Sequence, residues 1–349
     1  MTGKQDIRAL SHQQLTERLQ AMQWPAWRAR QVIDWLQKGV HSFDQMSNLP
    51  AALREQLQQH YILPCVDIVS KQVSALDGTV KYGFALHDGE QIESVLMKYH
   101  HGWSQCISTQ AGCRMGCAFC ATGKDGFRRH LTAGEMISEI ETAQQDHGIR
   151  VSSLVLMGMG EPLDNYDNVV SLLDWLSQEG GVQIGMRHIS LSTCGLVDKI
   201  EQLMQHKYQL TLSISLHAPN DEIRDRLMPI NRKWPVQRLL QCCREYAKVT
   251  GRRISFEYAM IDGINDTDAC AAQLAQQLRG MLCHVNLIPI NTVQGTPWRA
   301  SSRARINAFS KILSDRGITV TVRRTLGADI EASCGQLRRR LQQAKEETR

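Results

Sequence analysis

The sequence predicts an α/β fold: a partial barrel of six strand–helix units, preceded by a small N-terminal helical domain and a β-hairpin extension. Three successive patterns along the chain lead to this prediction. Apolar residues lie at helical spacing up to about residue 62, alternate with polar residues over 66–98, and from residue 104 form strand-like runs separated by helical stretches. Strands that are separated by helices pair in parallel, and such a sheet readily curls into a partial barrel.

Residues 1–65 are expected to form the helical domain. The Trp24-Pro25 pair ends the first helix, because proline cannot continue the hydrogen-bond ladder. A second helix is expected at about 27–36 and a third at about 51–61. The buried face of the first helix would be formed by Leu10, Leu15, Leu19 and Met22.

Residues 66–98 are expected to form the β extension. Asp77-Gly78 and Asp88-Gly89 are typical of tight hairpin turns. They separate three alternating stretches, which predict antiparallel strands at about 67–73, 79–86 and 91–98.

Residues 99–335 are expected to form the barrel. Its strands are predicted at 104–109, 151–157, 187–193, 209–216, 253–261 and 283–290. The helices that follow them are predicted at about 133–147, 166–178, 197–206, 235–250, 266–279 and 302–316. A last strand at 318–325 precedes a basic tail, residues 336–349, which includes Arg338, Arg339 and Arg340.

Composition limits the class of protein. The 349 residues are 42% hydrophobic and 21% charged, which is ordinary for a soluble protein. No apolar run approaches the roughly 20 residues needed to span a bilayer, and the first residues do not resemble a signal peptide. Eleven cysteines in such a chain indicate a reducing cytoplasm, where thiols bind metals or react. The net charge of +5 and several arginine clusters permit a polyanionic partner.

The segment GCRMGCAFCATG carries three cysteines, Cys113, Cys117 and Cys120, spaced C-x3-C-x2-C. Three thiolates can hold three irons of a [4Fe–4S] cube and leave the fourth iron open, whereas closed iron–sulfur and zinc sites use four protein ligands. This is the pattern of radical S-adenosylmethionine (SAM) enzymes, which bind SAM at the open iron. Phe119 would shield the cluster from water. The alternatives are three buried cysteines, or zinc with a distant fourth ligand.

Polar groups follow several predicted strands at the edge of the sheet where the cysteines would lie. Gly160 would let a ligand approach the backbone, and Glu161 could accept a hydrogen bond from the SAM ammonium group. Later strands end at residues that could hold a nucleoside or an amino acid. Each of these is alternatively a satisfied loop residue: Ser192, Thr193, Ser215, Leu216, His217 and Asn291.

Together with the cysteine segment, further motifs extend over nearly the whole chain: QIESVLMKY, MGMGEPLDN, ISLSTCG, SISLHAPND, NLIPIN and DIEASCGQL. With them the sequence closely resembles the RlmN/Cfr family of radical SAM RNA methyltransferases. The resemblance implies that Cys113, Cys117 and Cys120 ligate the cluster. SAM contacts would come from Gly160, Glu161, Ser192, Ser215, Leu216, His217 and Asn291.

The resemblance also implies the reacting groups. Cys334 would carry the methyl group as S-methylcysteine, and Cys106 would resolve the protein–RNA adduct by attacking Cys334, which implies a disulfide bond between them. Glu93 matches a family carboxylate that accepts a proton. Adenine C2 and C8 are poor nucleophiles, so one SAM would methylate Cys334 and a second would generate the radical that activates this methyl group. The sequence does not divide the proton transfer between Glu93 and Cys106.

The implied substrate is 23S ribosomal RNA, with transfer RNA as a second substrate, and the implied electron donor is a protein such as flavodoxin or ferredoxin. The helical domain and the arginine clusters would contact RNA phosphates. HVNLIPIN and RRTLGADIEASCGQL look more like the C2-methylating RlmN branch, whereas CATGKDG looks nearer to the C8-methylating Cfr branch. We therefore favour C2.

Two other functions remain open at this stage. A different radical SAM enzyme, acting on a protein or small molecule, would keep the cysteine triplet but would not need the Cys106–Cys334 pair. A non-catalytic, zinc-stabilised RNA-binding protein would be colourless, whereas an iron–sulfur protein is brown.

Overall fold

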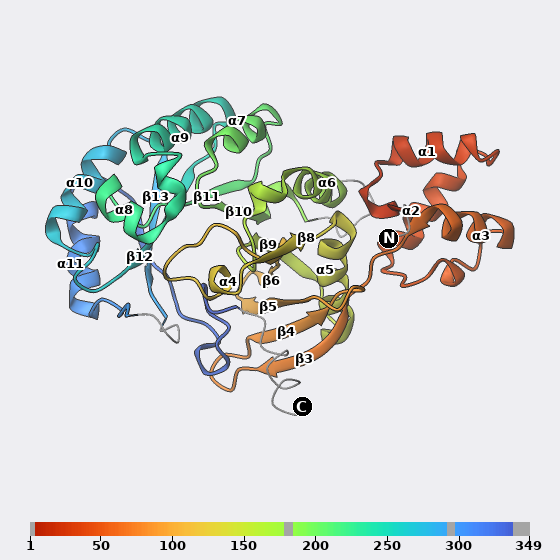
Figure 1. Cartoon of the computed structure of the whole chain (residues 1–349), viewed down its shortest axis with the longest axis horizontal. Coiled ribbons are helices and arrows are strands. Elements are labelled where there is room, and N and C mark those ends of the chain that lie inside the picture. The colour runs from red at the N-terminus through yellow and green to blue at the C-terminus, as the bar shows by residue number, and fades with distance from the viewer. Residues whose placement is uncertain (1–3, 178–183, 292–296, 338–349) are drawn as a thin grey trace.

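One ten-stranded sheet forms the centre of the molecule (Figure 1). The computed structural model describes residues 4–177, 184–291 and 297–337. The strand order in the large sheet is β14-β13-β12-β11-β10-β9-β6-β5-β4-β3. The sheet therefore stays open, as expected for a partial barrel.

The parallel part of the sheet confirms the predicted strand–helix series. Its seven strands are β6 (Gly102–Cys106), β9 (Val151–Leu156), β10 (Ile189–Thr193), β11 (Thr211–Ser215), β12 (Ile254–Met260), β13 (Cys283–Pro289) and β14 (Val320–Val322). The connecting helices are α5 (Ala133–His147), α6 (Tyr166–Ser177), α7 (Val197–Gln205), α9 (Val236–Thr250), α10 (Asp268–Leu278) and α11 (Arg303–Ser314). Their apolar faces pack on the sheet, and every residue of β12 is buried.

The antiparallel strands are confirmed as β3 (Asp67–Val73), β4 (Val80–Ala85) and β5 (Gln91–Tyr99). They belong to the same sheet as the parallel strands, because β5 pairs antiparallel with β6. In that pairing Val95 lies opposite Cys106. The antiparallel extension thus forms one wall of the core. β3 is the edge strand of the large sheet.

The N-terminal region contains the three expected helices, α1 (His12–Ala21), α2 (Arg28–Gln37) and α3 (Ala51–His60). Ser11 caps α1 by accepting a hydrogen bond from the Gln14 N–H at 3.1 Å. Arg8, which is fully buried, pairs with Glu141 of α5 at 2.7 Å and so ties this region to the barrel. Figure 1 shows the three helices grouped at one end of the molecule.

Short elements were not predicted, because they contain too few residues to show a period. Two of them flank the cysteine segment: β7 (Gln110–Gly112) and β8 (Phe127–His130) pair as an antiparallel ribbon. The other helices and strands are β1 (Gln5–Asp6), β2 (Tyr61–Ile62), α4 (Ala121–Lys124) and α8 (Asp221–Leu227). The 3-10 turns are η1 (Ile7–Ala9), η2 (Phe43–Gln45), η3 (Pro162–Asn165), η4 (Met186–His188), η5 (Pro229–Arg232) and η6 (Ala328–Ile330).

Two further expectations concern membrane spans and the C-terminal tail. No helix within the described residues has the length and hydropathy needed to cross a membrane. The expected basic tail, 336–349, lies outside the described residues except for Gln336 and Leu337.

Candidate active site

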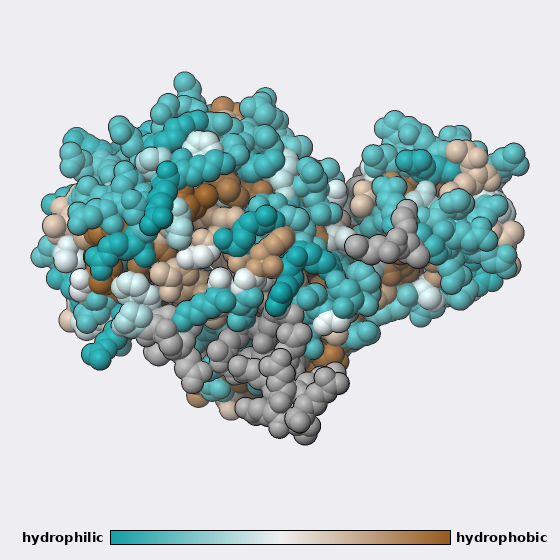
Figure 2. All heavy atoms as spheres, in the orientation of Figure 1, coloured by the Kyte–Doolittle hydropathy of each residue, from teal (hydrophilic) through white to brown (hydrophobic). Residues whose placement is uncertain are grey.

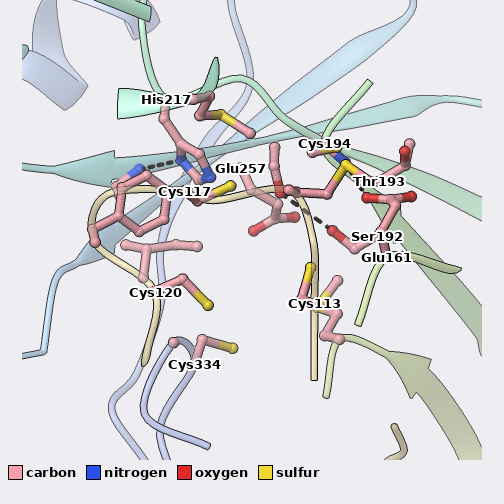
Figure 3. A pocket seen from close by; sticks show the side chains of 18 of the residues that line it. Cys113, Cys117, Cys120, Glu161, Ser192, Thr193, Cys194, His217, Glu257 and Cys334 are labelled. Carbon is pink, nitrogen blue, oxygen red and sulfur yellow. Dashed lines mark hydrogen bonds between the residues drawn. The ribbon is translucent and has the colours of Figure 1, made fainter. Parts of the chain in front are cut away.

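A cavity of about 170 Å³ lies at the carboxyl ends of the parallel strands. Figure 3 shows cysteine sulfurs, carboxylates and an imidazole gathered around it. Figure 2 shows hydrophobic side chains in a hollow near the centre of one face, surrounded by hydrophilic residues. Among the residues that line the cavity are ten of the expected site residues: Cys113, Cys117, Cys120, Gly160, Glu161, Ser192, Ser215, His217, Asn291 and Cys334.

The cysteine segment reaches the cavity from the β7–β8 ribbon. Gly112, at φ +80°, ends β7, and a side chain there would meet the Gly126 carbonyl oxygen at 1.8 Å. The ribbon can therefore close only with glycine at this position. The Cys113 N–H donates to the Gly126 carbonyl oxygen at 3.1 Å, and the Cys120 N–H donates to that of Cys117 at 3.1 Å. These bonds hold the loop in a compact form around the cavity.

Glu161 fastens two strand ends together. One carboxylate oxygen accepts the Leu163 N–H at 3.0 Å, and the other accepts the Cys194 N–H at 2.7 Å. Burial raises the pKa of Glu161, and these backbone donors oppose that rise. Gly160, at φ +107°, precedes it, and a side chain there would lie 2.7 Å from Gln110. The carboxylate is thus fixed at the cavity wall.

Two serines and a histidine also line the cavity. The hydroxyl oxygens of Ser192 and Ser215 lie 3.5 Å apart on neighbouring strands. His217 has a left-handed backbone, φ 56°, and its Nδ1 accepts the Ala259 N–H at 2.9 Å. Burial, aided by the charge of Arg224, lowers the pKa of His217 to about 3, so the ring is neutral. Leu216 is buried but does not line the cavity.

Phe119 lies where its expected shielding role requires. Its ring meets the edge of the His217 ring with centroids 4.8 Å apart, and both side chains line the cavity. Asn291, from the segment after β13, donates to the Cys334 carbonyl oxygen at 3.5 Å. Asn291, expected to contact SAM, therefore lines the cavity and also contacts the Cys334 backbone.

Cys334 lines a second, smaller cavity of about 40 Å³ as well as the first. Cys106, at the end of β6, lines only the smaller one. Burial raises the pKa of Cys106, the nearby Cys334 adds to the rise, and the Arg323 guanidinium opposes it. Arg323 also lines both cavities. The structure thus brings the two reactive cysteines of the resemblance to one small space.

The expected disulfide bond between Cys106 and Cys334 is not present, because all eleven cysteines are free thiols. Cys106 is fixed within β6, where it lies opposite Val95 and Val155 of the neighbouring strands. Cys334, by contrast, lies outside any helix or strand. The expectation of a formed disulfide is therefore wrong for this structure.

Glu93 lies on β5 and lines neither cavity. Its carboxylate is buried and lies 3.5 Å from the Lys81 ammonium group. Its carbonyl oxygen accepts the Ser108 hydroxyl at 2.7 Å. The structure places Glu93 on β5, the strand next to the β6 strand that carries Cys106.

Comparisons with known proteins show the family of the chain. Residues 107–273 match the family model of the radical SAM superfamily, and residues 5–63 match that of the ribosomal RNA large subunit methyltransferase N-terminal domain. A probable dual-specificity RNA methyltransferase RlmN from Alkaliphilus oremlandii (strain OhILAs) is 49% identical over 337 residues, 97% of this chain and 98% of the relative. One from Pelotomaculum thermopropionicum (strain DSM 13744 / JCM 10971 / SI) is 50% identical over 317 residues, 90% of this chain and 86% of the relative. The chain belongs to the RlmN family of radical SAM RNA methyltransferases.

A solved radical SAM methyltransferase has the same fold. The crystal structure of a radical SAM methyltransferase from Sphaerobacter thermophilus superposes with a TM-score of 0.90 at 44% identity. The superposition covers 96% of this chain and 99% of that chain. The fold described above is therefore the fold of this enzyme class along nearly its whole length.

Radical SAM membership implies a [4Fe–4S] cluster and SAM, and the residues of this RlmN-family chain fit both. A cube takes one cysteine per iron, so its ligands surround a space and do not converge on one point. Cys113, Cys117 and Cys120 lie around the cavity in this way (Figure 3). Within the described ranges no three Cys, His, Asp or Glu side chains could share a single metal ion, which a cube does not require. Burial raises the pKa of Cys113 to about 12, and iron would replace the proton.

Two positioning residues of this RlmN-family site were missed. Arg224 of α8 is fully buried and donates to the carbonyl oxygens of Cys194 at 2.6 Å and Leu216 at 3.1 Å. Asn265 donates to the His217 carbonyl oxygen at 2.7 Å and so supports its left-handed backbone. Both side chains donate hydrogen bonds to backbone carbonyl oxygens, and no sequence pattern indicates which carbonyl a side chain will bind. A buried arginine in the NDEIRDR segment, between two apolar strands, was the nearest available clue.

Proposed function

We propose that this protein methylates an adenine ring carbon, C2 in preference to C8, in 23S ribosomal RNA and transfer RNA. The observation that carries the proposal is the shared wall of the two cavities: Cys334 lines both, with the cysteine triplet in one and Cys106 in the other. The names of the relatives, dual-specificity RNA methyltransferase RlmN, support RNA and more than one substrate. C2 follows from the RlmN-like motifs of the sequence.

The proposed ligand roles follow the cavity lining. Cys113, Cys117 and Cys120 would hold the [4Fe–4S] cluster. Glu161 would face the ammonium group of SAM, and the main chain at Gly160 would allow its close approach. Other contacts to SAM would come from four residues of the cavity lining, Ser192, Ser215, His217 and Asn291. The family resemblance adds Leu216, which lies outside that lining. When bound, the cluster and SAM supply one-electron chemistry, and the protein supplies position and exclusion of water.

Residues of the chain would then transfer the methyl carbon to the adenine ring and remove the ring proton. Cys334 accepts a methyl group from SAM and presents that carbon to the adenine ring, because a thiolate is a competent nucleophile and the ring is not. Either Glu93 or Cys106 takes the ring proton. Attack of the Cys106 thiolate on the Cys334 sulfur would break the bond between that sulfur and the transferred carbon and form a transient Cys106–Cys334 disulfide. The carbon gains a proton to become the methyl group of the released base, and a thiol reductant then returns both cysteines to the free thiols of the resting protein. Two SAM molecules are consumed per turnover, and a protein such as flavodoxin or ferredoxin supplies the electron.

RNA binding would involve the N-terminal helices. Trp27 is 56% exposed, and the Arg28 guanidinium stacks on its ring at 4.1 Å. An exposed aromatic ring paired with a cation suits contact with unpaired bases and phosphates. The target adenine must leave its stack to reach a buried cavity. A cytoplasmic location is consistent with such substrates.

A nucleoside assay tests the proposal. The anaerobically reconstituted protein is incubated with SAM, a reductant and either 23S ribosomal RNA or transfer RNA, and nucleosides are identified by mass spectrometry. We expect 2-methyladenosine from the wild type and none from Cys334→Ala. Cys65→Ala is the matched control, because Cys65 is half-buried and lines neither cavity. Finding only 8-methyladenosine would overturn the C2 assignment, and normal turnover by Cys334→Ala would favour a different radical SAM reaction.

A further inference from the structure

Cys334 lies in a segment with little regular structure. We call residues 327–337 the Cys334 loop; its one regular element is the short 3-10 turn η6. Backbone without a hydrogen-bond ladder opens easily unless side chains hold it. The contacts that hold this loop come from segments far away in the sequence, and they form two groups.

The first group comes from the β3–β4 turn, residues 74–79. The Asp329 carboxylate accepts the Ser74 hydroxyl at 2.7 Å and the Ala75 N–H at 2.9 Å. In the reverse direction, the Asp77 carboxylate accepts the Gly327 N–H at 2.9 Å. The hydrogen bond from Ser74 lowers the pKa of Asp329, so the carboxylate stays ionised at neutral pH. Three hydrogen bonds thus join the turn to the start of the Cys334 loop.

Lys81 of β4 adds a link to the expected proton acceptor. Its ammonium group lies 3.5 Å from the Glu93 carboxylate and 3.4 Å from the Glu331 carbonyl oxygen. Lys81 is buried, and Glu331 has a left-handed backbone, φ 49°. One buried cation therefore contacts both Glu93 and the backbone three residues before Cys334. Movement of the loop would alter the surroundings of that carboxylate.

The second group holds the other side of Cys334. The Gly335 carbonyl oxygen accepts the Ala121 N–H at 2.8 Å, and the Leu337 carbonyl oxygen accepts the Thr122 hydroxyl at 2.7 Å. Ala121 and Thr122 begin α4, directly after Cys120. The Cys334 loop is therefore held between the β3–β4 turn and the cysteine segment.

We propose that Ser74, Asp329 and Lys81 are positioning residues that hold Cys334 for reaction. This inference rests on the proposed function, in which the Cys334 sulfur meets SAM, the adenine ring and Cys106 in turn. Each encounter needs near-contact geometry, and a displacement of about 1 Å can cost on the order of 100-fold in rate. The antiparallel extension therefore does more than complete the sheet, because it also fixes the loop that carries the methyl group.

Two measurements on the reconstituted full-length protein test the inference. The first is the alkylation rate of Cys334 by iodoacetamide, followed by peptide mass spectrometry, with Cys65 as the internal reference. The second is the steady-state rate of RNA methylation. The variants are Asp329→Ala, Asp329→Asn and Ser74→Ala, with Asp67→Ala as the matched control. Asp67 lies exposed on the same hairpin and carries the same charge.

For Asp329→Ala we expect Cys334 alkylation to rise about fivefold, kcat to fall about tenfold, and KM for RNA to stay within about twofold of the wild type. Asp329→Asn keeps an acceptor for the Ala75 N–H and should recover most of the rate. Ser74→Ala removes the hydroxyl that donates to Asp329 and that accepts the Leu76 and Asp77 N–H groups within the turn. Its methylation rate should lie between the rates of the two Asp329 variants.

The inference would be overturned if Asp329→Ala and Asp67→Ala gave the same rate of Cys334 alkylation and the same rate of RNA methylation. A fall in kcat without faster Cys334 alkylation would overturn it as well. If Asp329→Ala does not fold, Ser74→Ala decides by the same alkylation readout. Failure of the wild type to methylate RNA would overturn the proposed function instead, because alkylation does not depend on turnover.

Discussion

The backbone N–H of Ala121 donates a 2.8 Å hydrogen bond to the carbonyl oxygen of Gly335. Ala121 directly follows the last cysteine of the triplet, and Gly335 directly follows Cys334. One backbone hydrogen bond therefore joins the proposed cluster-binding segment to the proposed methyl carrier. This main-chain contact acts beside the side-chain hydrogen bond from the Thr122 hydroxyl to the Leu337 carbonyl oxygen, which joins the same two segments.

Ala121→Pro should break this link and spare the cluster. Ala121 is the first residue of α4, where proline is tolerated, and Cys120 before it has the extended backbone that proline requires, φ −102° and ψ 127°. Proline removes the N–H and places a ring carbon against the Gly335 oxygen. We expect unchanged iron content and visible absorption but a fall in RNA methylation of about tenfold. Ala121→Gly, which keeps the N–H, is the control. If Ala121→Pro lost iron and Ala121→Gly did not, the expectation that the hydrogen bond can be broken without loss of the cluster would be wrong.

Cys106→Ala should stop the reaction after the carbon has reached the RNA. Without the resolving thiol, Cys334 stays bonded to the base, and a covalent protein–RNA species should replace most of the product. Denaturing gel electrophoresis with labelled RNA measures it. Cys270→Ala is the control, since Cys270 is a buried cysteine of α10 outside both cavities. Free methylated RNA at the wild-type rate would show that Cys106 has no such role.

Glu161→Gln should weaken both the protein and its affinity for SAM. Both carboxylate oxygens accept backbone N–H groups, so the amide nitrogen of glutamine must face one of these donors. A buried donor left unpaired costs about 1–3 kcal/mol, which urea unfolding would measure. Loss of the negative charge should also lower SAM affinity by about tenfold in equilibrium binding. The exposed Glu222→Gln on α8 should change neither value. Unchanged SAM binding by Glu161→Gln would remove this residue from the SAM site.

The free energy of unfolding should decrease as the pH is lowered, and the buried His217 should account for part of this decrease. Its pKa is about 3 in the folded protein, against an ordinary value of 6.5. Below pH 6.5 the unfolded chain therefore binds a proton that the folded chain refuses. The stability that the neutral His217 contributes to the folded protein is fully present above pH 6.5 and is lost as the pH falls toward 3. Urea unfolding between pH 5 and 8 should show a shallower dependence for His217→Gln than for the wild type. Equal slopes would contradict a neutral, buried His217.

The main elements were predictable because each has a clear period or turn signal. Asp77-Gly78 marks the β3–β4 turn, and the aliphatic and aromatic residues of β12 mark a strand. The burial of Ser255 and Glu257 on that strand was not predicted. The cysteine triplet and the strand-end groups were also predictable as members of one site, because parallel strands bring their carboxyl ends to one edge.

The contacts that hold the site were not predictable from the sequence. Arg224 satisfies backbone carbonyls, and Asp329 binds a turn far away in the chain, as the 255-residue separation from Ser74 shows. Neither contact produces a local sequence pattern, because the tertiary fold alone brings the two partners of each contact together. Cys106 and Cys334 could be singled out only through the family resemblance. Glu93, named through the resemblance, and Leu216, named first as a strand-end residue, do not line the cavities.

Cys334 stands in the partition between two chambers of unequal size. The torsion that swings a cysteine sulfur has three staggered settings, so travel from one chamber to the other is a choice among a few discrete orientations. A reagent that caps this sulfur would consequently close both compartments in a single event. For an inhibitor designer, the dividing wall is thus a more efficient target than either chamber alone.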